Sequence, residues 1–183
     1  GVIKSLDYFE KMGISSLWLN PVLENNMETY SYHGYAMTNL YNVDPRYGTN
    51  EQYKELADKA KEKGIGIIMD QVANHIGSLH PWMSDLPSED WVNQWPEFTQ
   101  TNHMKVSRFD PHAAEVDRKQ FTDGWFVETM PDLNQRNEKL ARYLIQNSIW
   151  WVEYLGLHGI RMDTWSYPDK QFLADWTKAI LDE

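Results

Sequence analysis

The sequence contains no cysteine, which excludes disulfide bonds and thiolate metal sites. It also has no run of the roughly 18 apolar residues that a transmembrane helix requires, so no insertion into a membrane is expected. Basic residues are outnumbered, since 17 Lys and Arg stand against 27 Asp and Glu, giving a net charge of −10. Because phosphate groups bind to basic surfaces, this charge argues against nucleic acid as a partner.

Aromatic side chains are abundant, and nine Trp, ten Tyr and six Phe make up 14% of the 183 residues. Two interpretations stay open at this stage. The rings either form a core rich in Trp or, in part, provide platforms for flat ligands such as sugars.

Strand-like and helix-like segments alternate along the chain. Apolar runs predict strands at 14–22, 65–72 and 159–165, and helical spacing predicts helices over 2–12, 51–63, 137–155 and from Pro168 onward. The run at 65–72 is continuous rather than alternating, which is typical of a parallel strand buried on both faces. Asn50 is a candidate cap for the helix over 51–63. We therefore expect an α/β fold with a parallel sheet and right-handed crossovers.

One connection is too long for a plain strand–helix unit. Residues 76–136 separate the second strand from its helix, and they contain several prolines, four tryptophans and no sustained period. Long segments of this kind are uncommon unless they are functional or form a small subdomain. We predict three parts: residues 1–75, an inserted subdomain over 76–136, and residues 137–183, which continue the first part.

Polar side chains follow the predicted strands at their carboxyl ends. Asp70, Asn74 and His75 follow the second strand, while Arg161 and Asp163 stand two apart at the end of the third. Side chains two apart on a strand share a face, and ligands of parallel sheets bind at this edge. The sequence therefore predicts a site that these groups share.

Each residue also has an ordinary structural explanation. Arg161 and Asp163 would form a buried ion pair, Asp70 would cap a turn, and His75 would be a hydrogen-bonded core histidine. The segment "HGY" at 33–35 would be a glycine turn beside an aromatic residue. Convergence on one sheet edge is what favours function over these alternatives.

Four segments resemble, in order, the sequence signatures of the α-amylase family, glycoside hydrolase family 13. They are "YHGYAMTNLYNVDPRYGT" at 32–49, "DQVANH" at 70–75, "MPDLN" at 130–134 and "GIRMD" at 159–163. Their form is similar to the neopullulanase, cyclomaltodextrinase and oligo-1,6-glucosidase side of the family. The resemblance implies a (β/α)8 TIM barrel whose inserted domain B corresponds to residues 76–136.

The resemblance also implies roles for the residues. Asp163 would be the nucleophile that forms a covalent glycosyl-enzyme, and Arg161 would lower its pKa. Asp70 would position this arginine. The sugar would be bound by three residues: His75 and His33 through hydroxyl groups, and Tyr35 through stacking.

Asn74 corresponds to the asparagine that binds calcium in some family members. Calcium-dependent α-amylases carry a histidine four residues after the nucleophile, where this chain has Tyr167. No cofactor is therefore predicted, and calcium at Asn74 stays an open alternative.

The implied activity is retaining hydrolysis of an α-glucan or maltooligosaccharide at α-1,4 bonds, with α-1,6 bonds left open. Two alternatives remain, namely a glycosyltransferase of the same family and a non-catalytic sugar-binding or transporter-accessory relative. Because starch polymers are usually met outside the cytoplasm, we hypothesise an exported location, secreted or periplasmic.

The chain is expected to be about strands 2–4 of the eight-stranded barrel. Residue 1 would already lie in the first helix, and the acid/base Glu and third Asp of the family would lie beyond Glu183. A retaining glycosidase needs two carboxyl groups roughly 5–5.5 Å apart, so the chain alone is expected to be inactive. Its unpaired sheet edges also predict either self-association or completion of the sheet by the rest of a longer protein.

Overall fold

The fold is built on parallel strands that pair in chain order. The computed structural model describes residues 1–29 and 31–183, and within them the strands β1 (Ser16–Leu19), β2 (Gly66–Gln71) and β3 (Gly159–Met162) form a sheet of order β1-β2-β3. Both pairings are parallel, with Asp70 opposite Arg161. The predicted α/β class and parallel sheet are confirmed, although each strand is shorter than its apolar run.

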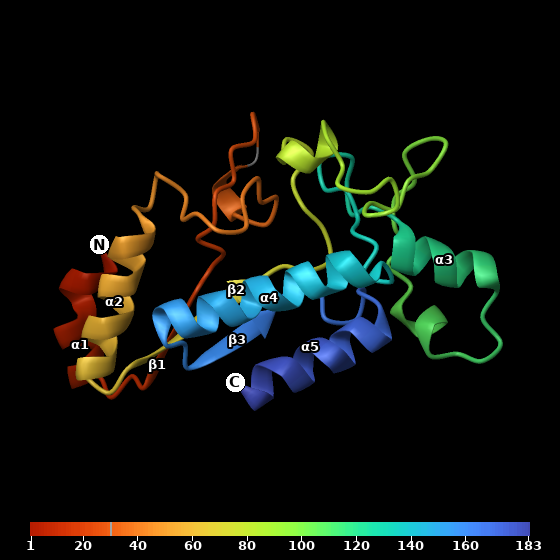
Figure 1. Cartoon of the computed structure of the whole chain (residues 1–183). Helices are drawn as coiled ribbons and strands as arrows, with labels where there is room; N and C mark the ends of the chain where they lie inside the picture. The colour runs from red at the N-terminus through yellow and green to blue at the C-terminus, as the bar shows by residue number, and fades with distance from the viewer. Residues whose placement is uncertain (30) are drawn as a thin grey trace.

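Helices follow the strands and pack on one face of the sheet (Figure 1). The longer ones are α2 (Asn50–Glu62), α4 (Glu138–Leu155) and α5 (Lys170–Asp182), and α1 (Leu6–Lys11) follows the 3₁₀ turn η1 (Val2–Ser5). The remaining elements are η2 (Ser31–His33), η3 (Pro81–Met83), η4 (Lys105–Arg108) and α3 (Glu115–Asp123). Among the described residues, no helix combines the length and apolar character needed to cross a bilayer.

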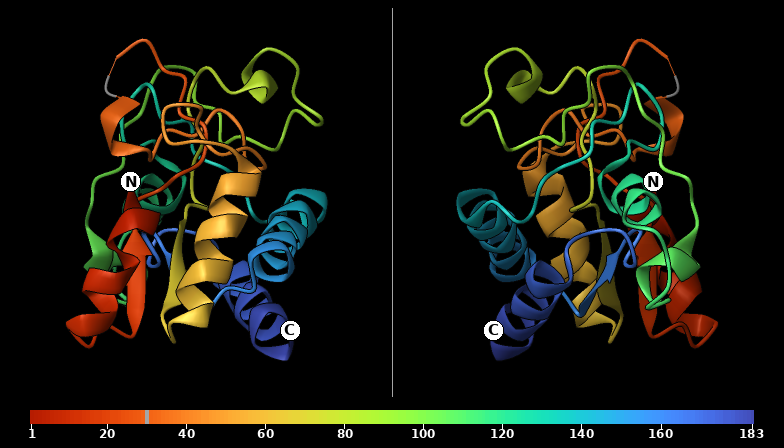
Figure 2. Two further views of the ribbon diagram at one scale, coloured as in Figure 1. Left: turned by 90° about the vertical axis from the view of Figure 1, so that its left-hand side faces the viewer. Right: turned by 90° about the vertical axis from the view of Figure 1, so that its right-hand side faces the viewer.

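The two faces of the sheet carry different side chains. Ile67, Met69 and Met162 belong to the buried core under the helices. The alternate positions, Asp70 and Arg161 among them, face away from that core, as the period of two along a strand requires. The connections after the strands gather at one end of the sheet (Figure 2). Asp70 and Arg161 are the second-last residues of β2 and β3 and therefore lie near that end.

Helix caps differ in part from the sequence prediction. Thr49, not Asn50, is the N-cap of α2, and it forms a capping box with Gln52. The Asn50 side chain instead accepts a hydrogen bond from the Val43 backbone N–H and donates to the Tyr41 carbonyl. A Thr-x-x-Gln pattern was present in the sequence, and it was the better signal.

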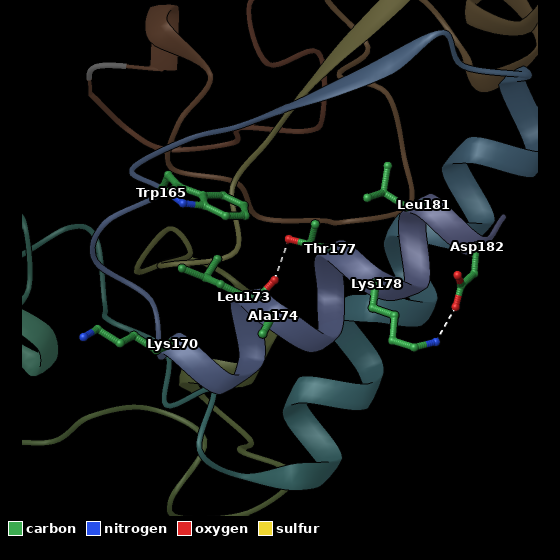
Figure 3. Close-up of a pocket in the computed structure, with 8 residues that line it drawn as sticks. All are labelled: Trp165, Lys170, Leu173, Ala174, Thr177, Lys178, Leu181 and Asp182. Atoms are coloured by element: carbon green, nitrogen blue, oxygen red, sulfur yellow. Dashed lines mark hydrogen bonds and ion pairs between the residues drawn. The ribbon is translucent and has the colours of Figure 1, made fainter.

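A surface hollow runs along α5, beside Trp165. Figure 3 shows the indole of Trp165 beside Leu173 and Thr177, over a hollow that continues along the helix to Leu181. β1 and β3 are the edge strands of the sheet, and neither pairs with a further strand in the described part of the chain. The self-association expected from such edges stays a prediction; light scattering of the purified chain would test it, and a monodisperse monomer would contradict it.

A buried carboxylate, Asp44, anchors the loop between β1 and α2. It accepts hydrogen bonds from the Asn25 backbone N–H at 3.0 Å and from the Arg46 guanidinium at 2.8 Å. Arg46 also donates to the carbonyl of Ser31. The hydrogen bonds to Asp44 lower its pKa to about 2, and the one from the Arg46 guanidinium contributes most.

Replacing Asp44 by Asn is expected to lower the free energy of unfolding at pH 7 by about 2 kcal/mol. Since the folded pKa lies below the unfolded value of 3.8, this contribution is complete above pH 3.8 and disappears as the pH falls toward about 2. Urea unfolding at several pH values measures it. The exposed Asp58, which pairs with Lys54, offers the control Asp58→Asn; an equal loss in both variants would contradict the prediction.

Candidate active site

An arginine on β3 bridges two carboxylates. One nitrogen of Arg161, Nη1, lies 3.0 Å from both oxygens of Asp70 and 2.7 Å from Oδ1 of Asp163. The arginine side chain is 38% exposed, whereas Asp70 is fully covered and Asp163 is 12% exposed. Arg161 and Asp163, at the end of β3, thus form a triad with Asp70, at the end of β2.

Asp70 forms the buried base of this cluster. Its Oδ2 accepts a hydrogen bond from the Trp18 indole N–H at 3.0 Å and one from the Tyr35 hydroxyl at 3.3 Å. The Arg161 guanidinium also lies over both aromatic rings, 5.3 Å from that of Trp18. Three donors therefore occupy the Asp70 carboxylate, which orients the arginine and has no oxygen directed to open space.

Asp163 lies one residue beyond β3, in a turn. Its backbone N–H donates to the Gln71 carbonyl at 2.7 Å, which fixes the turn to the end of β2. Burial raises the pKa of the Asp163 carboxyl, and the charge and hydrogen bond of Arg161 oppose this rise. Arg161 thus acts on this pKa in the predicted direction, while desolvation, which the sequence prediction did not include, exceeds its attraction.

His75 lies on a second, adjoining network. It forms an antiparallel bridge with Asp132, which brings "MPDLN" to the end of β2. Its ring is buried, and no described group satisfies Nε2 within hydrogen-bonding limits. Burial lowers the pKa of His75 to about 4, and the backbone of Tyr35 opposes this shift. At neutral pH the ring is therefore uncharged.

His33 and Tyr35 form the rim of the cluster. The Nδ1 atom of His33 accepts a hydrogen bond from the Tyr35 backbone N–H at 2.9 Å, and the two rings are stacked at 6.0 Å. Tyr35 contacts the triad directly through Asp70, whereas His33 is one step removed. Beside them the Tyr32 ring is 77% exposed. The predicted sugar-binding residues therefore adjoin one another, and their roles stay predictions.

The Asn74 region offers few free side-chain oxygens to a calcium ion. The Asn74 amide donates to Oδ1 of Asp132 at 3.0 Å, and Asn93 donates to Oδ2 at 2.8 Å, so both carboxylate oxygens already accept hydrogen bonds. Oδ1 of Asn74 and Nε2 of the adjoining His75 are left without a partner among the described groups. Calcium takes about 6–8 oxygen ligands, and no group of three acidic, His or Cys side chains gathers in the described part of the chain.

Sequence reasoning missed three residues of this region. Asp132 was present in a quoted signature but was given no role, although its charge beside Pro131 was a usable signal. Trp18 and Arg108, which contacts the turn after Asp163, had no such signal, because each acts through partners more than 50 positions away.

Acidification is expected to destabilise the protein through His75 and His80. Burial lowers the pKa of both to about 4, from 6.5. The unfolded state binds more protons below pH 6.5, so stability is complete above that value and falls toward pH 4, by up to about 3 kcal/mol per histidine. Unfolding of His80→Gln between pH 7 and 4 should show a weaker pH dependence; the exposed His112→Gln is the control, and parallel curves for both would refute the assignment.

The sequence and the structure of the chain are both similar to those of known proteins. The family model described as "Alpha amylase, catalytic domain" matches residues 1–178. Alpha-amylase 3 of Dictyoglomus thermophilum is 34% identical over 97% of the chain and 35% of that relative, and an oligo-1,6-glucosidase of Heyndrickxia coagulans is 32% identical over 89% and 30%. The crystal structure of an α-amylase from Geobacillus thermoleovorans, complexed with acarbose, superposes with a TM-score of 0.82 at 34% identity, covering the whole chain and 37% of that structure. The chain thus spans about one third of the length of these relatives.

Proposed function

The chain belongs to the α-amylase catalytic-domain family, and from this we propose that the protein containing it is a retaining glycoside hydrolase of α-glucans with Asp163 as nucleophile. The sheet is accordingly part of the family's TIM barrel. The observation that carries the proposal is the position of Asp163 beside Arg161, at the carboxyl end of a barrel strand.

The nucleophile must be ionised when the sugar arrives. Burial acts against ionisation, and the Arg161 nitrogen at 2.7 Å acts for it. Partial desolvation also leaves the carboxylate free of strong hydration, which favours attack on the anomeric carbon. The attack forms a glycosyl ester on Asp163 and releases the leaving oxygen with a proton from a general acid; water then cleaves the ester, with net retention.

The general acid is supplied by a residue outside this chain. Asp70 is the other carboxylate that contacts Arg161 among the described residues, but three donors occupy it and it is fully covered. It cannot reach a leaving oxygen. We therefore propose that the 183 residues alone do not turn over substrate; hydrolysis of maltoheptaose that Asp163→Asn abolishes would overturn this.

Tyr35, His33 and His75 would form the sugar subsite. Tyr35 and His33 provide adjoining rings at the rim, and the buried Nε2 of His75, which lacks a partner among the described groups, would bind a sugar hydroxyl once the site admits the sugar. Bonds at α-1,4 positions are the first proposal. The likeness to an oligo-1,6-glucosidase supports α-1,6 bonds as a second.

The inserted subdomain over 76–136 is part of the same proposal. Its two ends meet where His75 forms an antiparallel bridge with Asp132, as expected of a segment that leaves and re-enters the barrel. A second bridge joins Val92, inside the segment, to Leu133. Residues 1–75 and 137–183 then form one continuous part of the barrel, because β2 pairs with β3.

Trapping the glycosyl-enzyme tests the proposal. The full-length protein is incubated with a fluorinated glucosyl fluoride, which forms the ester quickly and hydrolyses slowly, and is then digested. Mass spectrometry should find the added sugar on the peptide that contains Asp163. A label on another carboxylate would refute the assignment. In a separate experiment, analysis of the reaction products with and without an added acceptor sugar distinguishes hydrolysis from glycosyl transfer. Lack of any label would favour the non-catalytic relative.

A further inference from the structure

The turn that carries Asp163 is strained. Thr164 has a φ of +48°, in the left-handed region that a β-branched residue rarely adopts. Its Oγ1 is buried without a hydrogen-bond partner among the described groups. The turn closes through a hydrogen bond from the Tyr167 N–H to the Thr164 carbonyl at 2.9 Å. A strained backbone persists only where its surroundings fix it, so neighbouring groups must hold this turn.

Arg108 is such a group. It lies at the end of η4 in the inserted segment, and its guanidinium binds the backbone carbonyls of three consecutive residues, Ser166, Tyr167 and Pro168. The bonds to Tyr167 and Pro168 measure 2.9 and 2.6 Å. Two nitrogens of one planar cation thus neutralise three carbonyl dipoles, a geometry that the fork of arginine provides and the single ammonium of lysine does not.

Tyr167 gives the inserted segment a second contact with the same turn. Its ring is 6% exposed and stacks on Phe121 at 4.4 Å. Its hydroxyl lies 3.1 Å from Nδ1 of His103. The turn is therefore fixed from the inserted segment both through its backbone and through a side chain.

We propose that Arg108 is a positioning residue that fixes the turn after Asp163 and thereby sets the orientation of the Asp163 carboxylate toward Arg161. The inserted segment then contributes to the reaction through the main chain at 166–168, in addition to any contact with the sugar. The anchoring stands on geometry alone, while its consequence for the reaction rests on the proposed nucleophilic role of Asp163.

Hydrogen exchange followed by mass spectrometry tests the anchoring without any need for activity. In Arg108→Ala the amides of residues 164–167 and 169 are expected to exchange at least about 10-fold faster, whereas those of β2 and α4 keep the wild-type rate. Arg108→Lys, which keeps the charge but loses the fork, should show most of the same increase. The control is Arg142→Ala, at an exposed position of α4, and it should change nothing.

Kinetics of the full-length protein test the positioning. Arg108→Ala is expected to lower kcat about 10- to 100-fold with little change in KM, because a displaced nucleophile impairs the reaction more than binding. Arg108→Lys recovers only part of kcat, and it serves as the test variant if Arg108→Ala does not fold. Unchanged exchange at 164–167 and 169 in a folded variant overturns the anchoring, and faster exchange with normal kcat overturns the positioning. Full activity of Asp163→Asn would instead refute the proposed function and leave the anchoring intact.

Discussion

Replacing Asp163 by Asn in the full-length protein is expected to lower kcat for maltooligosaccharide hydrolysis at least about 1,000-fold. The amide occupies the same volume but cannot form the glycosyl ester. The Nη1 atom of Arg161 lies 2.7 Å from Oδ1 of Asp163 and also contacts Asp70, so the arginine stays anchored when the second carboxylate is neutralised. Because the fold should survive, the loss is expected in kcat, with substrate affinity retained.

Initial rates and calorimetric titration of the same variant separate the two quantities. Asp175→Asn is a matched control, because Asp175 is an exposed carboxylate of α5 that bonds only Gln171 among the described residues. It should retain wild-type kcat. A loss of less than 10-fold in Asp163→Asn, with the control unaffected, would exclude the nucleophilic role.

Replacing Arg161 by Met is expected to have the second largest effect. The two carboxylates that share its guanidinium, Asp70 and Asp163, would then lie close together with no cation between them. Burial already raises the pKa of both, and Arg161 opposes the rise in each case. Without it, the pKa of Asp163 should rise further, and the fraction ionised at neutral pH should fall.

The pH dependence of kcat/KM measures this change. In Arg161→Met the acid limb is expected to move to higher pH, and kcat/KM at pH 7 should fall at least about 100-fold. Asp70→Asn in the same background removes one of the two charges and should return part of the acid limb toward its original position. An acid limb that is unchanged in Arg161→Met would show that the arginine does not control ionisation of the nucleophile.

Much of the fold could be predicted from local pattern. The helices over 51–63 and 137–155 and the buried run at 65–72 appear within a few residues of α2, α4 and β2. Their periodicity reflects burial on one side, which depends on near neighbours in sequence. The cap of α2 was placed one residue late, because Thr49 and Asn50 are both good capping residues and only the backbone conformation at Thr49 decides between them.

The residue pattern alone predicts that Arg161 and Asp163 face one direction at the end of a parallel strand, and that Asp70 lies at the end of the neighbouring strand. This follows from the period of two and from the shared direction of parallel strands. The quoted signatures further indicated the family, because their order and residue types can be recognised without any knowledge of distances.

The balance between these charges, in contrast, depends on the three-dimensional packing of the chain. The direction of the Asp163 pKa depends on how much water the surrounding chain removes, and this sum over distant segments cannot be obtained from spacing. The same holds for the contacts of Trp18 with Asp70 and of Arg108 with the turn at 166–168, which join residues 52 and about 60 positions apart. Hydrogen bonds depend on where the backbone carries each donor in space, and the fold as a whole sets that position.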